Sequence, residues 1–317
     1  MRIAFVGKGG SGKTTASSLF AQRMAKDFPV LAIDADINMH MAELLSGERP
    51  NKATLISEKG PSGEIRTHLR GMNPRITSND HFKKTTPPGS GSNLIDITDP
   101  NDWMINHYAT RLQENLALIT VGSYSEEGVA SSCYHNNLSV LENILTHTID
   151  KGVIITDMVA GTDAFANTLF SQFDMLVFVV EPTTRSVAVL EQYQRLANHT
   201  GISDKLFVIA NKVEDDDDYD FIKRSVGESK LLGRLSRSKH LLAVDKGREA
   251  LDYDRLDAED KTVFDTIMHE LPERSVSSQS RLPYLWELHR IYVNQGFVKD
   301  RFGDLTGQVD REFQYPE

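Results

Sequence analysis

The sequence has one cysteine, fewer basic than acidic side chains and no long apolar stretch. The single cysteine, Cys133, excludes a disulfide within the chain and fits a reducing compartment. Lysine and arginine total 35 against 45 aspartates and glutamates, a formal net charge of −10 at pH 7. That balance argues against nonspecific DNA binding, which basic side chains drive. No apolar run approaches the roughly 20 residues of a membrane-spanning helix.

The start of the sequence leaves no room for a leader peptide, because Met1 runs directly into an apolar segment. We therefore expect a soluble, cytoplasmic protein that docks on neither membranes nor nucleic acid. Its 317 residues, of which 39% are hydrophobic, suffice for one large domain or two small ones.

What the sequence does contain is a glycine-rich loop close to its N-terminus. Residues Gly7–Thr14 read GKGGSGKT and fit the phosphate-loop pattern G-x-x-x-x-G-K-[ST]. The apolar run Arg2–Val6 precedes the loop, and apolar residues at helical spacing follow it. Strand, glycine-rich turn and helix together predict a site for a nucleoside triphosphate.

Within such a loop each residue type has its own task. Backbone N–H groups surround the phosphates, and we assign this role to Gly9, Gly10, Ser11, Gly12 and Thr15. Lys13 is expected to reach the β- and γ-phosphates, and the Thr14 hydroxyl to coordinate Mg²⁺.

Further apolar runs predict the rest of an α/β fold. They are Val30–Ile33, Leu116–Gly122, Val153–Asp157, Met175–Val180 and Leu206–Ala210, with helical stretches between them. Unbroken apolar runs of this length are typical of parallel strands buried on both faces. The pattern predicts a three-layer P-loop NTPase fold, with a mostly parallel sheet and helices on both of its faces.

We expect a single ATPase domain with its core at residues 1–46 and 116–250. An insertion at about 47–115 and a helical C-terminal part at 251–317 complete it. The polar composition of Thr77–Asn93 predicts a mobile loop. Leu94–Ile97 and Leu241–Val244 are candidates for short strands, and a helix is expected from Pro283 to Gln295, just before Gly296.

Three carboxylates follow predicted strands. Asp34 and Asp36 end the second strand, and Asp157 closes a later one. Ligands of parallel sheets bind at the carboxyl ends of the strands, so these aspartates are candidates for the nucleotide site. Asp157 is expected to reach Mg²⁺; capping of a helix is the structural alternative for all three.

The segment Lys8–Thr15 resembles the deviant phosphate loop, KGGxGKTT, of the MinD/ParA class of ATPases. The resemblance implies that Lys8 reaches the nucleotide of a second protomer. It also implies that Asp36 orients the attacking water and that Asp34 holds metal-bound water. Asn211 and Lys212 resemble the class's base-reading turn, and the absence of a guanine signature after Val213 favours ATP over GTP.

Within that class the chain is most similar to the CooC-type nickel-insertion ATPases. Asp157–Asp163 reads DMVAGTD and resembles their D-x-x-A-G switch, in which Gly161 senses the γ-phosphate. Ser132–Leu138 resembles their C-Y-C-x-x-N metal segment, with His135 in place of the second cysteine. The resemblance implies nickel or zinc held by Cys133 and His135 at a dimer interface; a buried cysteine and a capping histidine without metal are the alternative.

Other branches of the class fit less well. One cysteine cannot supply the two that each iron-protein subunit gives to its cluster, and the tail Phe302–Glu317 is acidic and lacks a basic membrane helix. We predict a Mg²⁺-dependent ATPase whose ATP-bound homodimer acts on a protein client, with metal-centre maturation as its role. A ParA-like positioning switch that binds a partner or DNA is the first alternative, and an ATP-dependent ligase or amidase is the second.

Overall fold

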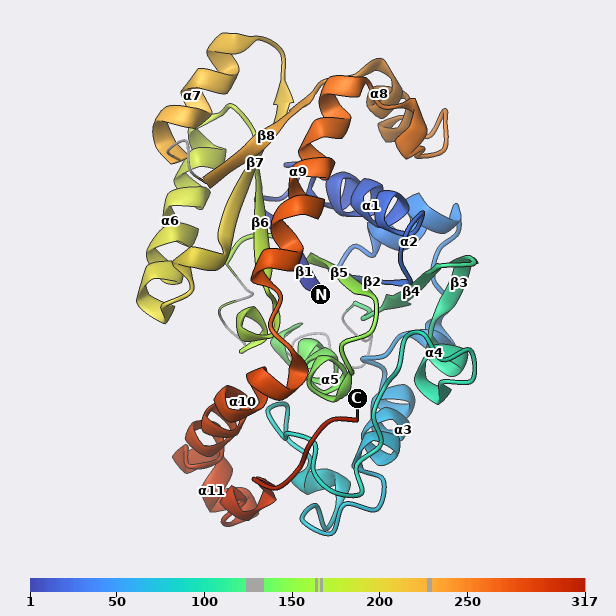
Figure 1. The fold of residues 1–317 in the computed structure, drawn as a ribbon, viewed down its shortest axis with the longest axis vertical. Helices are drawn as coiled ribbons and strands as arrows, with labels where there is room; N and C mark the ends of the chain where they lie inside the picture. The colour runs from blue at the N-terminus through green and yellow to red at the C-terminus, as the bar shows by residue number, and fades with distance from the viewer. Residues whose placement is uncertain (124–133, 163–164, 166–167, 227–229, 317) are drawn as a thin grey trace.

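Eight strands form one sheet in the part of the chain that the structure describes (Figure 1). The computed structural model describes residues 1–123, 134–162, 165, 168–226 and 230–316. The strands are β1 Arg2–Gly7, β2 Val30–Ala35, β3 Thr110–Gln113, β4 Leu116–Thr120, β5 Val153–Met158, β6 Met175–Val180, β7 Leu206–Val213 and β8 Leu231–Ser236. Their order is β3-β4-β2-β5-β1-β6-β7-β8. All neighbouring pairs are parallel except β3 with β4.

Helices cover both faces of this sheet. The α-helices are α1 Lys13–Met24, α2 His40–Ser46, α3 Lys59–Arg70, α4 Trp103–Tyr108, α5 Tyr134–His147, α6 Thr184–Thr200, α7 Asp216–Val226, α8 Lys239–Asp245, α9 Ala258–Arg274, α10 Ser278–Val293 and α11 Gly296–Phe302. Short 3-10 turns connect them: η1 Lys52–Thr54, η2 Asn79–His81, η5 Leu169–Gln172, η6 Ser203–Lys205, η8 Tyr253–Arg255 and η9 Thr306–Gln308.

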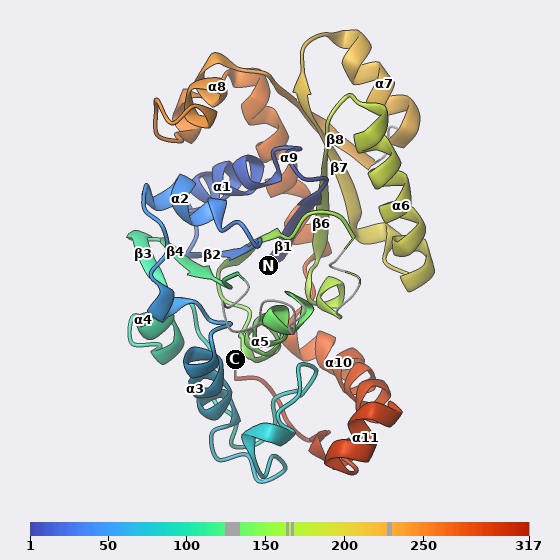
Figure 2. The same ribbon diagram turned by 180° about the vertical axis from the view of Figure 1, so that it is seen from behind.

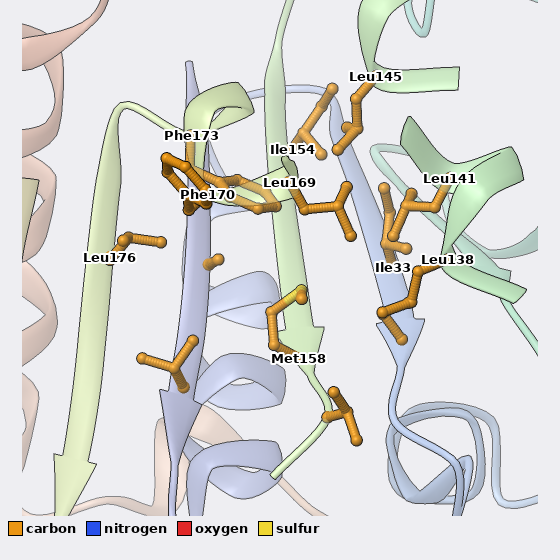
Figure 3. Packing of buried hydrophobic residues seen from close by; sticks show 14 of the residues in the cluster. Ile33, Leu138, Leu141, Leu145, Ile154, Met158, Leu169, Phe170, Phe173 and Leu176 are labelled. Carbon is orange, nitrogen blue, oxygen red and sulfur yellow. The ribbon is translucent and has the colours of Figure 1, made fainter. Parts of the chain in front are cut away.

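Alternate residues of each strand point into two separate cores. Ile3 and Phe5 of β1 pack with α1, α2, α8 and α9, whereas Ala4 and Val6 pack with α3, α5, α6 and α7. Figure 3 shows part of the second core, where Leu138, Leu141 and Leu145 of α5 lie over the sheet. Both faces of the parallel sheet are therefore buried, which explains the unbroken apolar runs. The predicted three-layer α/β fold is confirmed.

Local signals set several helix boundaries. The Thr183 hydroxyl accepts a hydrogen bond from Ser186 N at the start of α6, and Gly201 ends that helix with a φ of 72°. A capping hydroxyl followed by a left-handed glycine is a common pair of helix limits. These two signals set the bounds of α6 at Thr184 and Thr200.

Both predictions of short strands were wrong. Leu241–Val244 lies in α8, because Ser238 caps Leu241 N, and the last strand is instead β8. In Leu94–Ile97, only Ile95 forms an isolated bridge, with Thr148.

The C-terminal helix also differs from its prediction. It begins at Ser278, where the Ser277 hydroxyl accepts a hydrogen bond from Ser280 N, so Pro283 lies inside it. Gly296 starts the next helix, α11. The serine cap was the stronger start signal.

The segment Thr77–Asn93 is packed, and the mobile loop predicted from its composition was wrong. Thr85 and Thr86 are buried. Thr85 Oγ1 lies 3.1 Å from His289 Nδ1, and Thr86 Oγ1 donates to Gln308 Oε1 at 3.3 Å. Polar side chains of this segment find their partners about 200 residues away in the sequence, which composition cannot reveal. The C-terminal part is thereby joined to the insertion.

Candidate nucleotide-binding site

The phosphate loop Gly7–Thr14 connects β1, at the centre of the sheet, to α1. Gly12 precedes α1 with a φ of 90°. A Cβ at this position would lie 2.2 Å from Asn211 Nδ2. Only glycine combines this backbone conformation with so close a contact. The loop therefore requires the glycine that the motif predicts here.

Two side chains at the end of β7 form hydrogen bonds with the backbone of the phosphate loop. Asn211 Nδ2 donates to Ser11 O at 2.7 Å, and Lys212 Nζ donates to Gly10 O at 2.6 Å. Lys212 itself has a φ of 58°, which is uncommon outside glycine. The resemblance implied that these two residues read the base. In the structure both side chains hold the backbone of the phosphate loop, and their role in reading the base stays a prediction.

Lys13 is paired with a carboxylate in this structure. Its Nζ lies 2.5 Å from Asp36 Oδ2 and 4.0 Å from Asp157 Oδ1. Burial alone would lower the pKa of Lys13, but the charges of Asp157 and Asp36 outweigh it and raise the pKa. Burial would likewise raise the pKa of Asp36, but the Lys13 charge and the hydrogen bonds from Lys13 and Asn38 together outweigh it and lower the pKa. Both groups are therefore ionised at neutral pH.

Thr14 and Asp157 form the second contact of the site. Thr14 Oγ1 donates to Asp157 Oδ2 at 2.7 Å. The other oxygen, Oδ1, is buried and accepts no hydrogen bond. A buried carboxylate oxygen without a donor calls for a cation. Asp157 Oδ1 and the Thr14 hydroxyl are hard oxygen donors of the kind that Mg²⁺ prefers, so these residues fit that ion.

Asp34 lies beside Asp157, because β2 and β5 pair with these two residues in register. Asp34 Oδ1 accepts from Asp36 N at 3.2 Å, and Oδ2 accepts from Ala42 N at 3.1 Å. Burial raises the pKa of both Asp34 and Asp157, and the proximity of the two carboxylates adds to the rise for Asp34. Two buried carboxylates side by side repel one another, and a divalent cation would relieve that repulsion.

Within the described ranges, no group of three or more histidine, cysteine, aspartate or glutamate residues could hold a metal ion. This agrees with how Mg²⁺ binds in nucleotide sites, where one or two protein oxygens act together with water and substrate phosphates.

A glutamate missed in the sequence completes the site. Glu181 follows β6, the neighbour of β1, and its Oε1 accepts from Lys212 Nζ at 2.6 Å. Lys8 Nζ lies 3.9 Å from Glu181 Oε2, and the Lys8 side chain is 36% exposed. Glu181 lies directly after a parallel strand, and this position is the signal that could have identified it in the sequence.

Gly161 approaches the loop from the other side. Its N–H donates to Gly7 O at 2.9 Å. The segment after β5 is thereby attached to the phosphate loop, where a γ-phosphate sensor would have to lie.

A cleft of about 1040 Å³ opens above these groups, and its size suits a nucleotide. The phosphate-loop side contributes Gly9, Gly10, Gly12, Lys13, Thr14, Thr15 and Asp36. The lining also includes residues that the sequence did not connect with the site: Leu235, Ser236, Arg237, Ser238, Leu241 and Leu242. The first four lie at or just after the end of β8, which was not predicted, and the last two lie in α8, which was predicted as a strand.

The suggested transition-metal pair cannot be placed. Cys133 lies outside the described residues, and His135 is described only as part of the backbone of α5. Metal binding by this pair stays a prediction.

No helix in the described part of the chain is long and apolar enough to cross a membrane.

Comparison with known proteins agrees with this geometry. Residues 3–250 match the CobQ/CobB/MinD/ParA nucleotide binding domain. An uncharacterised ATP-binding protein of Methanocaldococcus jannaschii is 30% identical over 233 residues, which cover 72% of this chain and 82% of that protein. The carbon monoxide dehydrogenase accessory protein CooC of Rhodospirillum rubrum is 27% identical over 249 residues, or 78% and 87% of the two chains.

Among solved structures, a ParA family ATPase from Chlorobium tepidum shares the fold. Its TM-score is 0.59 at 18% identity, with 85% of this chain and 98% of that chain covered.

Proposed function

Because the chain belongs to the CobQ/CobB/MinD/ParA nucleotide-binding family, we propose that it is a Mg²⁺-dependent ATP hydrolase whose ATP-bound form is a homodimer. The observation that carries the proposal is the convergence of four side chains at the carboxyl ends of β1, β2 and β5: Lys13, Thr14, Asp36 and Asp157.

Binding of ATP begins at the loop. The amides of Gly9–Thr15 and the N-terminus of α1 surround the phosphates, and Lys13 leaves Asp36 to contact the β- and γ-phosphates. Thr14 and Asp157 would hold Mg²⁺, which neutralises charge on the phosphates during transfer. Asp34, next to Asp157, holds metal-bound water.

When Lys13 moves to the phosphates, the Asp36 carboxylate is free to act in hydrolysis. The freed carboxylate keeps its contacts with Asn38, because its Oδ1 accepts hydrogen bonds from Asn38 N at 3.0 Å and from Asn38 Nδ2 at 2.9 Å. It then orients the water that attacks the γ-phosphate. Positioning of this kind is most of what phosphoryl transfer asks of a base.

The base would occupy the part of the same cleft that residues 236–238 and the apolar side chains of α8 line. An aromatic base would stack or pack on apolar side chains there.

Lys8 acts in trans in this proposal. It is partly exposed, and its nearest carboxylate, on Glu181, is 3.9 Å away, so little holds it to its own protomer. In a dimer whose protomers face each other through their phosphate loops, Lys8 of one protomer would lie beside the γ-phosphate of the other protomer's nucleotide. Charge supplied in trans can raise phosphoryl-transfer rates by about 10³-fold or more.

The trans role is tested by sedimentation and turnover. With a non-hydrolysable ATP analogue and Mg²⁺, the wild-type protein should sediment as a dimer. Lys8→Ala should bind the analogue, stay monomeric and lose turnover. Arg195→Ala, an exposed site on α6, is the matched control. Normal dimerisation and hydrolysis by Lys8→Ala would refute the trans mechanism.

A role in metal-centre maturation is the biological setting we favour. It is supported by the 27% identity to the CooC accessory protein and by the Cys133–His135 segment. Anaerobically purified protein should bind nickel or zinc in the presence of ATP, at one ion per dimer, and Cys133→Ser should lose it. Absence of bound metal with and without ATP would remove this role and leave a positioning switch of the ParA kind.

A further inference from the structure

A second cleft, of about 1010 Å³, lies apart from the phosphate loop. Its lining comes from the insertion around η2, from α5, from the segment after β5, and from α10 and α11. Figure 2 shows α3 and the pair α10–α11 on either side of α5. No phosphate-loop residue lines it. The cleft is therefore a separate feature, formed where the insertion meets the C-terminal helices.

Three cations of this cleft have no carboxylate partner among the described residues: Arg66, Lys83 and Arg301. Arg66 donates only to neutral groups, Asn143 Oδ1 at 3.3 Å and Ser139 Oγ at 2.8 Å. Lys83 Nζ donates to the Asp80 carbonyl. The Phe302 ring centroid lies 2.9 Å from Lys83 Nζ and 5.1 Å from the Arg301 guanidinium. Their charges are thus left for a ligand.

These cations are close enough to repel one another. Burial lowers the pKa of Lys83 to about 8, and Arg301 and Arg66 contribute to the decrease, while Asp80 opposes it. The other nearby carboxylate is Glu142, which accepts a hydrogen bond from Thr168 Oγ1. Burial raises the pKa of Glu142 to about 7, so this carboxyl is partly neutral at physiological pH. An anion bound in the cleft would relieve the repulsion between the cations.

Apolar side chains accompany the charges. The lining includes Phe82, Phe165, Phe170, Leu288 and Tyr292. At the rim, Phe297 is 68% and Ile291 52% exposed. Together with the apolar lining they offer a surface on which apolar side chains of a ligand can pack.

We propose that this cleft binds an acidic segment of a partner protein, in which aromatic or aliphatic side chains lie between the carboxylates. The carboxylates would pair with Arg66, Lys83 and Arg301, and the apolar side chains would pack on Phe297 and Ile291. Pockets for small ligands measure about 300–1,000 Å³ and enclose most of the ligand. This cleft has about the volume of the nucleotide cleft, so size does not identify its ligand, whereas its exposed apolar side chains and its cations favour an acidic peptide that contains apolar residues. Its concave form does not suit a membrane surface.

The proposal can be tested without a known partner. The probe is a display library of random peptides, roughly twelve residues long, selected on the full-length protein. The enriched peptides should be acidic and contain aromatic or large aliphatic residues. A synthetic copy of the most enriched peptide, labelled with fluorescein, then gives a Kd by anisotropy.

Exposed positions provide the variants, so that folding is preserved. Arg301→Glu and Phe297→Ser should each weaken peptide binding about tenfold or more. The control Arg195→Glu/Arg224→Glu reverses two exposed charges on α6 and α7 and should change the Kd less than about twofold. Retention of nucleotide binding by every variant separates failure of this proposal from failure of the ATPase assignment.

Four results would overturn the proposal. They are failure to enrich any peptide, enrichment of neutral or basic peptides, equal binding by the cleft variants, and binding only of phenyl phosphate or of vesicles containing phosphatidylserine.

Discussion

Asp36 and the phosphates of ATP compete for Lys13. We therefore expect Asp36→Asn to bind ATP more tightly but to hydrolyse it more slowly. In the structure, Lys13 Nζ lies 2.5 Å from Asp36 Oδ2, and both side chains are at most 7% exposed. Asp36→Asn keeps the shape and one acceptor but removes the charge. Lys13 then keeps two acidic neighbours, Asp157 at 4.0 Å and the more remote Asp34.

The magnitudes follow from this geometry. Breaking a buried ion pair costs about 3–5 kcal/mol, and the retained acceptor and Asp157 reduce the loss to about 2 kcal/mol in the nucleotide-free protein. Nucleotide binding no longer has to break the pair, and the removed carboxylate no longer repels the γ-phosphate. We expect ATP to bind about tenfold more tightly, which corresponds to about 1.4 kcal/mol.

Turnover should change in the other direction, because the carboxylate that orients the attacking water is missing. We expect a loss of about 10²-fold or more in kcat. Calorimetric titration with a non-hydrolysable analogue gives the affinity, urea unfolding gives the stability, and phosphate release gives kcat. Asn38→Ala is the matched control, because it removes one of the two hydrogen-bond donors to Asp36 Oδ1, the side-chain amide, and leaves the charge of Asp36. Weaker ATP binding by Asp36→Asn, or turnover at the wild-type rate, would refute the reasoning.

Two further predictions concern the C-terminal helices. Asp174 is buried and accepts from Arg281 Nη2 at 2.6 Å and from Arg2 N at 2.8 Å, so Asp174→Asn should lower the free energy of unfolding by about 3 kcal/mol in urea titration. A loss below about 1 kcal/mol would contradict this. Burial lowers the pKa of His289 to about 4, below the unfolded value of 6.5. The unfolded chain therefore binds the proton first, and stability should fall as the pH decreases from 6.5 to 4, by up to about 1.4 kcal/mol per pH unit. His289→Gln should make the free energy of unfolding depend less on pH. If wild type and variant show the same dependence between pH 6.5 and 4, His289 is not its cause.

Much of the fold could be predicted because its signals are local. The loop Gly7–Thr14 contains the glycines that its turn requires, and the strands β1, β5 and β6 consist mainly of consecutive apolar residues. Asp34 and Asp157 were found by a general rule, that parallel sheets bind ligands where their strands end. The structure adds that these two residues are paired in register.

What could not be predicted depends on contacts between distant segments. The strand β8 has mostly half-buried residues and a glycine in its middle, so no clear pattern indicated it. Arg237 and Ser238 of the nucleotide cleft were missed with it. The buried position of Thr86 depends on Gln308, 222 residues later. Contacts between residues so far apart in the sequence cannot be predicted from local composition.

The central claim is that this chain hydrolyses ATP at the phosphate loop, and parallel assays of wild type and Lys13→Ala test it most directly. Lys13 is the group expected to contact the β- and γ-phosphates, and no other cation lies within 4.0 Å of Asp36 or Asp157 in the described residues. Wild-type protein should bind ATP with Mg²⁺ and release phosphate, with both activities lost on chelation of the metal. Lys13→Ala should keep its fold and show neither activity. Phosphate release by Lys13→Ala at the wild-type rate, or failure of the wild-type protein to bind ATP, would contradict the account.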